Sequence, residues 1–134
     1  VDEEVRKLVE KTKESLNTGL KILKDGVSVG SLGAKIYGVL DSAGLGVVKQ
    51  FVGHGVGHNL HEAPEIPNYG TKNTGPILCA GMTIAVEPMS TLGDDKVYID
   101  KDGWTVKTSD GSMSAHFEDT ILITKSGIEV LTTA

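Results

Sequence analysis

The residues best suited to chemistry are concentrated in residues 53–62, which read GHGVGHNLHE. His54, His58, His61 and Glu62 fall within nine residues there, and imidazole and carboxylate groups are common metal ligands. His54 and His58 have the i, i+4 spacing of a helical metal pair, but the two glycines between them make a helix improbable. The segment is therefore predicted to be a glycine-flanked loop that carries imidazoles.

A zinc-protease helix of the HExxH type can be excluded in the same segment. His61 and Glu62 match its first two positions, but the last position is Glu65, and Pro64 would interrupt the helix. Two interpretations of the histidines remain open: ordinary polar loop residues, or imidazoles that glycine allows other groups to approach closely.

Two carboxylates lie in segments that otherwise have the composition of β strands. Glu87 ends the apolar run 82–87, where it is either hydrated at the rim or inside and bound to a cation, because burial of an isolated charge is costly. Glu118 lies within the run 114–124 and shares a strand face with His116. It is either a charge that protects an edge strand or a carboxylate compensated by a metal ion.

His54, Glu87 and Glu118 together offer one imidazole and two carboxylates, a donor set suited to Mn, Fe, Co or Zn. A site with two ions about 3.5–4 Å apart needs more oxygen ligands than these. The three residues are therefore predicted to be part of a larger metal site.

Two helices followed by strands must position these residues. Hydrophobic spacing predicts a helix over residues 5–23, ended by Asp25-Gly26, and a second that starts between residues 28 and 31 and ends at Gly44. Asp110-Gly111 predicts a hairpin and residues 125–127 a looser turn, whereas the stretch 53–78 is predicted to be largely loop and functional. Strands are predicted at 47–52, 82–87, 97–100, 104–108, 114–124 and 128–131.

Composition limits the function classes for this chain of 134 residues, which we expect to form a single domain over 1–134. A net charge of −5 disfavours a nucleic-acid partner, and no apolar run is long enough to span a membrane. The N-terminal residues lack the pattern of a secretory signal, and the single Cys79 cannot form an intramolecular disulfide. A cytoplasmic location is expected.

Motifs across nearly the whole chain resemble type I methionine aminopeptidases, members of the pita-bread metallopeptidase family. They are Gly-His-Gly-Val-Gly at 53–57, His-Glu-Ala-Pro-Glu-Ile-Pro-Asn-Tyr-Gly at 61–70, Gly-Met-Thr-Ile-Ala-Val-Glu-Pro-Met at 81–89, and the stretch from Asp-Gly-Trp-Thr-Val at 102–106 to Phe-Glu-Asp-Thr at 117–120. The resemblance implies an α+β fold: the C-terminal half of a pita-bread domain, with two helices packed on a mostly antiparallel curved sheet.

The resemblance also implies roles for individual residues. His54 and Glu87 would ligate one metal, and Glu118 would bridge two divalent ions (Co, Mn, Fe or Zn) in the complete enzyme. His61 would be catalytic, contacting the scissile amide of the substrate, and Trp104 would lie near the substrate groove. Two aspartate ligands of the family precede the segment that this chain matches.

The implied reaction is hydrolytic removal of methionine from the N-terminus of a peptide or nascent chain. Because the aspartate ligands are missing, the chain alone is expected to have no or greatly reduced turnover. A non-catalytic pita-bread protein-binding module is the alternative, and self-association through the exposed face of the half-domain is a third expectation. His116 and Asp119 depart from the family, which usually has Gln and His there.

Overall fold

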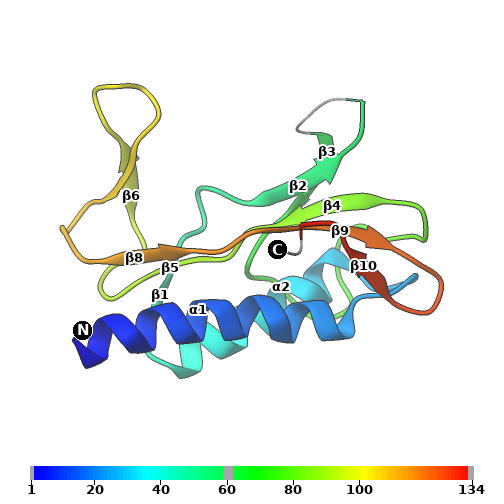
Figure 1. Ribbon diagram of the computed structural model, residues 1–134, viewed down its shortest axis with the longest axis horizontal. Helices are drawn as coiled ribbons and strands as arrows, with labels where there is room; N and C mark the ends of the chain where they lie inside the picture. Colours follow the sequence, from blue (N-terminus) through cyan, green and yellow to red (C-terminus); the bar gives the residue numbers. More distant parts are fainter. Residues whose placement is uncertain (1, 59–61, 133–134) are drawn as a thin grey trace.

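A computed structural model describes residues 2–58 and 62–132. Two helices, α1 (Glu3–Ile22) and α2 (Val29–Ser42), lie side by side beneath a layer of strands (Figure 1). The strands are β1 (Gly46–Val47), β2 (Gly53–Val56), β3 (Glu62–Ile66), β4 (Thr83–Val86), β5 (Met89–Thr91), β6 (Val97–Ile99), β7 (Val106–Thr108), β8 (Ser114–His116), β9 (Asp119–Ile123) and β10 (Ile128–Val130).

The two helices start and end close to their predicted positions. The Asp2 carboxylate caps α1 by accepting a hydrogen bond from the backbone N–H of Glu4, and the Ser28 hydroxyl caps α2 by accepting one from Ser31. Gly26 and Gly44 follow the helices with positive φ angles, which glycine adopts at little cost. Both predicted helices are confirmed.

All strand pairs in the described residues are antiparallel. The largest sheet has the order β10-β9-β4-β2-β3, and a smaller one has the order β1-β5-β8. β6 and β7 form a separate hairpin that projects away from the helices (Figure 1). The prediction of an α+β fold with helices on a mostly antiparallel sheet is confirmed.

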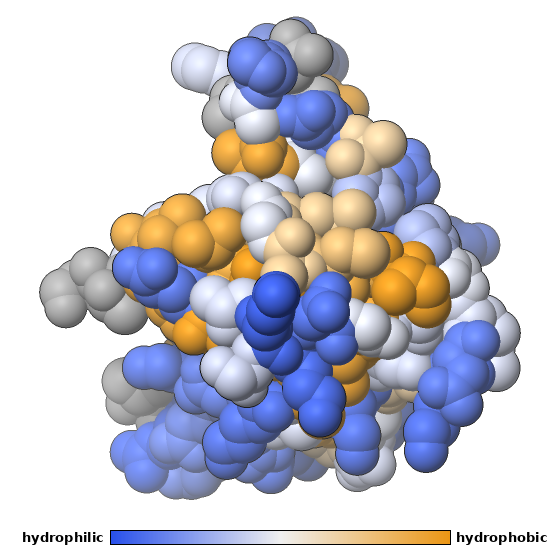
Figure 2. Space-filling view, turned by 90° about the vertical axis from the view of Figure 1, so that its right-hand side faces the viewer, coloured by the Kyte–Doolittle hydropathy of each residue, from blue (hydrophilic) through white to orange (hydrophobic). Residues whose placement is uncertain are grey.

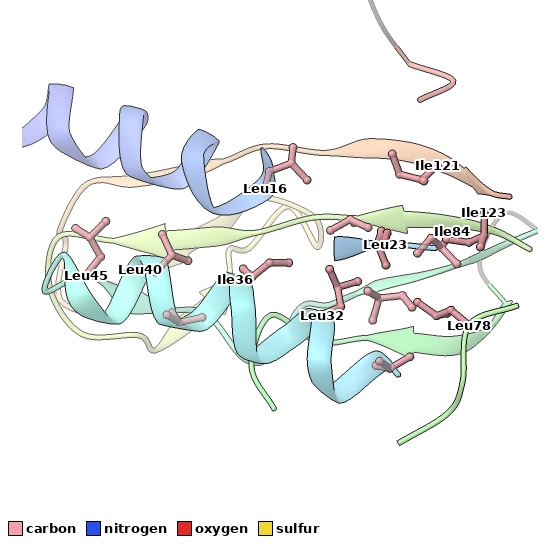
Figure 3. Packing of buried hydrophobic residues seen from close by; sticks show 14 of the residues in the cluster. Leu16, Leu23, Leu32, Ile36, Leu40, Leu45, Leu78, Ile84, Ile121 and Ile123 are labelled. Carbon is pink, nitrogen blue, oxygen red and sulfur yellow. The ribbon is translucent and has the colours of Figure 1, made fainter. Parts of the chain in front are cut away.

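The hydrophobic core lies between the helices and the two larger sheets (Figure 3). Leu32, Ile36 and Leu40 of α2 are fully buried against Ile84 and Ile121 of the largest sheet. In the end-on view of Figure 2, hydrophilic side chains cover the lower, helix-bearing part, whereas apolar ones gather in a band above it. Among the described residues, no helix is long and apolar enough to cross a membrane.

The stretch 53–78, predicted to be largely loop, also contains β2 and β3, so the prediction of a loop was wrong for the glycine-rich residues at its start. The glycines of β2 have low intrinsic strand propensity, but β2 pairs with β3 on one side and with β4 on the other. A methyl group at Gly53 would lie 2.1 Å from the Ala85 carbonyl oxygen, and one at Gly55 2.3 Å from that of Ala63. The glycines are therefore required by close strand packing.

Two strand predictions and the hairpin prediction need correction, and one strand was missed. The run 114–124 is two strands, β8 and β9, that belong to different sheets, and the run 47–52 reduces to the short β1. β5 was not predicted. Asp110-Gly111 forms a turn, but β7 and β8 on either side of it pair with other strands, since the hairpin signal describes a local turn and not the partner of each strand.

Candidate metal centre

The centre lies where the chain crosses between the two larger sheets. Val86 of β4 pairs with Asp119 of β9, and Met89 of β5 pairs with His116 of β8. The register is the same on both sides of the crossing, so Glu87 lies opposite Glu118. Like charges directly opposite each other destabilise a strand pair, so this arrangement calls for compensation.

Pro88, next to Glu87, interrupts the ladder at this crossing because proline has no backbone N–H to donate. One backbone bond remains, in which the N–H of Phe117 donates to the carbonyl oxygen of Pro88 at 3.1 Å. Glu87 and Glu118 therefore lie just outside regular strands, where their side chains can converge.

His54 reaches the same place from β2. It pairs with Ala85 of β4, which shares a strand face with Glu87 because side chains alternate along a strand. Its Nε2 lies 3.1 Å from Oε2 of Glu87, and its Nδ1 lies 2.9 Å from the carbonyl oxygen of Gly55. Both side chains are largely buried, with exposed fractions of 15% and 17%. The backbone contact fixes the orientation of the imidazole.

Asn68 supports the backbone at Glu87. Its fully buried side chain donates from Nδ2 to the carbonyl oxygen of Glu87 at 3.0 Å. The other polar atom, Oδ1, has no hydrogen-bond partner within the described part of the chain. Asn68 thus holds the main chain at the point where β4 leaves its sheet.

His116 is the residue that the sequence analysis did not include in the site. Its Nε2 lies 3.5 Å from Oε1 of Glu87, and one ligand atom each from Glu87, His116 and Glu118 lie within 4.8 Å of one another. His54 contacts this group through Glu87. The signal in the sequence was the spacing of two between His116 and Glu118, which places both side chains on the same side of an extended chain.

The two imidazoles set the protonation of Glu87. Burial alone would raise the pKa of the Glu87 carboxyl, but the hydrogen bond from His116 and the electrostatic effect of the nearby His54 and His116 side chains together outweigh it, and the pKa lies below its ordinary value. In turn, the Glu87 carboxylate, as hydrogen-bond partner and as a charge, raises the pKa of His116. Glu87 is therefore an anion at neutral pH, as a metal ligand must be.

Comparison with known proteins gives the family. The profile of metallopeptidase family M24 matches residues 1–125. The chain belongs to this family. A methionine aminopeptidase of Mycoplasma capricolum is 48% identical over 125 residues, which are 93% of this chain and 50% of that protein. A methionine aminopeptidase of Bacillus subtilis is 44% identical over 132 residues, which are 98% of this chain and 53% of that protein.

Solved structures agree with the fold. A methionine aminopeptidase from Thermotoga maritima has a TM-score of 0.97 and 48% identity, and the match covers 100% of this M24 chain and 54% of that one. A prolidase from Pyrococcus furiosus has a TM-score of 0.70 and 26% identity, and the match covers 99% of this chain and 34% of the prolidase. The predicted pita-bread fold is confirmed, and the chain spans about half the length of the relatives that it matches.

An open cleft of about 360 Å³ adjoins the centre of this M24 chain. Its polar side is formed by Glu87, His116 and Ser114, and its apolar side by Phe51, Met89 and Val106. A second cleft, of about 490 Å³, lies on the His54 side and includes two further carboxylates, those of Glu62 and Glu65. The centre is therefore accessible from two sides.

The remaining predicted site residues lie elsewhere or cannot be placed. Trp104 is 81% exposed in the turn between β6 and β7, and it is not among the described residues that line the cleft beside Glu87. His61 lies outside the described residues. Asp119, the other departure from the family, accepts a hydrogen bond from the Thr132 hydroxyl at 2.8 Å. Asp119 thus anchors the C-terminal end of the described chain.

The donor set fits the divalent ions that M24 metallopeptidases use. Two carboxylates that face each other repel, and with an imidazole on each side of Glu87 they form a donor group that a cation would stabilise. The structure thus brings His54, Glu87 and Glu118 to one place.

Proposed function

We propose that this chain supplies the C-terminal half of a methionine aminopeptidase, which removes methionine from the N-terminus of a peptide or nascent chain. One observation carries the proposal: Glu87 and Glu118 face each other beside His54, in a chain of family M24 with relatives named methionine aminopeptidase. A purely protein-binding role would not require these groups to converge.

His54, Glu87 and Glu118 are the residues that we expect to hold metal. Divalent Co, Mn, Fe or Zn ions bound here would supply Lewis-acid chemistry, which polarises a carbonyl and activates water for hydrolysis. Glu118 would be shared between two ions, and the two aspartates expected from the resemblance would complete the pair. The role of Asn68 is to keep the backbone of Glu87 in place.

The cleft beside Glu87 suits a methionine side chain. Phe51, Met89 and Val106 offer an apolar wall to an apolar side chain, and burial of that side chain favours binding. Contact of His61 with the scissile amide and of Trp104 with the substrate stay predictions, as do self-association and a cytoplasmic location.

Methionine release from a Met-Ala-Ser peptide, measured with added Co²⁺ or Mn²⁺, tests the function. We would compare the chain alone with a chimera that joins it behind the part of the Bacillus subtilis relative that it does not match. The chain alone should show no or greatly reduced turnover, and the chimera should release methionine.

Two variants of the chimera make the test specific. Glu118→Gln should lose nearly all activity, whereas Glu129→Gln, an exposed glutamate on β10, should keep it. A folded chimera that binds metal but releases no methionine, or one in which Glu118→Gln is fully active, would contradict the proposed function.

A further inference from the structure

We propose that His116 is itself a metal ligand, so that this chain binds one divalent transition-metal ion without the two aspartates expected upstream. The ion would be held by the group Glu87, His116 and Glu118, with His54 adjoining it through Glu87. The inference rests on the proposed function, because it concerns the same centre, but it assigns a residue for which the family resemblance implies no such role.

The distances favour a shared ion. Metal bonds of about 2.0–2.2 Å, with right or tetrahedral angles between them, separate two donor atoms by about 2.8–3.6 Å. His116 Nε2 and Glu87 Oε1 are 3.5 Å apart, and His54 Nε2 and Glu87 Oε2 are 3.1 Å apart. Both separations lie in that range, whereas 3.5 Å is at the outer limit for an N–H···O hydrogen bond.

The strand geometry explains why His116 can reach the ion. His116 is the last residue of β8 and pairs with Met89, two positions beyond Glu87 on the opposite strand. Residues two apart on a strand point to the same face, so Glu118, Glu87 and His116 extend toward one side of the crossing. With 41% of its side chain exposed, His116 can adjust its ring without disturbing the core.

The second imidazole also decides the class of ion. A centre with nitrogen donors from His116 and His54 favours Co²⁺, Ni²⁺ or Zn²⁺ over Mg²⁺ and Ca²⁺, which prefer oxygen ligands alone. The three donors of the group, with the His54 imidazole beside Glu87, supply most of the coordination of one such ion. Loss of the His116 imidazole would therefore weaken the binding of the ion.

Calorimetric titration of the purified chain with Co²⁺ alone tests this, together with the visible absorption of bound cobalt, which reports the type and number of its ligands. The key variant is His116→Gln, which keeps an N–H donor near Glu87 but removes the imidazole. The matched control is His58→Gln, an exposed histidine in the loop after β2. Circular dichroism of each variant would check that the chain is folded.

We expect one Co²⁺ per chain, and His116→Gln should weaken binding by more than the roughly 10–100-fold that loss of an outer-sphere partner costs. Its cobalt spectrum should change, and His58→Gln should match the original chain. Equal affinity and an equal spectrum for His116→Gln would overturn the inference and leave the proposed function intact. Failure of the original chain to bind Co²⁺ would also overturn the inference, whereas the proposed function would be overturned only by the absence of methionine release from the chimera.

Discussion

The helix-to-sheet core and the sheet crossing are stabilised in different ways. In the core, α2 packs Leu32, Ile36 and Leu40 against apolar strands, and all three side chains are fully buried. At the crossing, Glu87 and Glu118 face each other beside two imidazoles. The core is therefore stabilised by apolar packing, whereas the crossing is arranged around charges that a cation would balance.

The largest loss of unfolding free energy is expected from Ile36→Ala in the core. The substitution removes a fully buried side chain between α2 and the sheet, and should cost about 2–5 kcal/mol of unfolding free energy. Urea denaturation followed by circular dichroism would measure it, with or without metal. Ile99→Ala, at a side chain that is 53% exposed, is the control and should change little. A loss below 1 kcal/mol at Ile36 would contradict the packing described.

A smaller loss is expected from Gly33→Ala, which tests the contact of α2 with the loop after β3. The added methyl group would lie 2.2 Å from the carbonyl oxygen of Tyr69, and overpacking of this kind costs about 1–3 kcal/mol. At Gly38 in the same helix, a methyl group would meet no described atom within 4 Å. Gly38→Ala should therefore stabilise the helix by up to roughly 1 kcal/mol, and equal effects at both sites would refute the argument.

Asn68→Ala should affect both the stability of the fold and the binding of metal at the crossing. It leaves the carbonyl oxygen of Glu87 without its donor, at a cost of about 1–3 kcal/mol, and should also weaken Co²⁺ binding because the backbone of a ligand is released. Thermal unfolding and calorimetric titration would measure the two effects. The control is Asn17→Ala, at an exposed residue of α1, which should change neither the stability nor the Co²⁺ affinity. An unchanged Co²⁺ affinity in Asn68→Ala would contradict a role for Asn68 in positioning Glu87 as a metal ligand.

The smallest effect on stability is expected from the ionisation of Asp110, which lies away from the metal centre. Hydrogen-bond donors of Ser112 and Asp94 lower the pKa of its carboxyl to about 2 in the folded chain. Its stabilising contribution is therefore complete above the ordinary pKa near 4 and is lost as the pH falls through about 2. A nuclear magnetic resonance titration of the carboxyl would check this, and a midpoint near 4 would contradict it.

The helices could be predicted from sequence because their signals are local. The apolar spacing, the Ser28 cap and the glycines after each helix act within a few residues of each other. The strand β2 could not be predicted in this way, because its glycines are needed only for close packing against β3 and β4, which come later in the chain. The break between β8 and β9 likewise depends on Pro88, which lies in the gap between β4 and β5.

The same distinction applies to the centre. His54, Glu87 and Glu118 could be selected from sequence because each is an unusual polar residue in a glycine-rich or apolar run. Their convergence depends on the unbroken register across the two sheets, which no local pattern encodes. His116 was passed over as a ligand for that reason, although its spacing from Glu118 was visible.

The central claim is that Glu87 and Glu118 oppose each other around a place for a cation, and unfolding of Glu118→Gln with and without Co²⁺ tests it most directly. Without metal, the variant should be more stable than the original chain by about 0.2–1 kcal/mol, because the opposed like charges are removed. At 100 times the dissociation constant, Co²⁺ should stabilise the original chain by about 2.7 kcal/mol and the variant far less, so that the order reverses. A variant that is less stable without metal, and that gains as much from Co²⁺ as the original chain, would contradict the account.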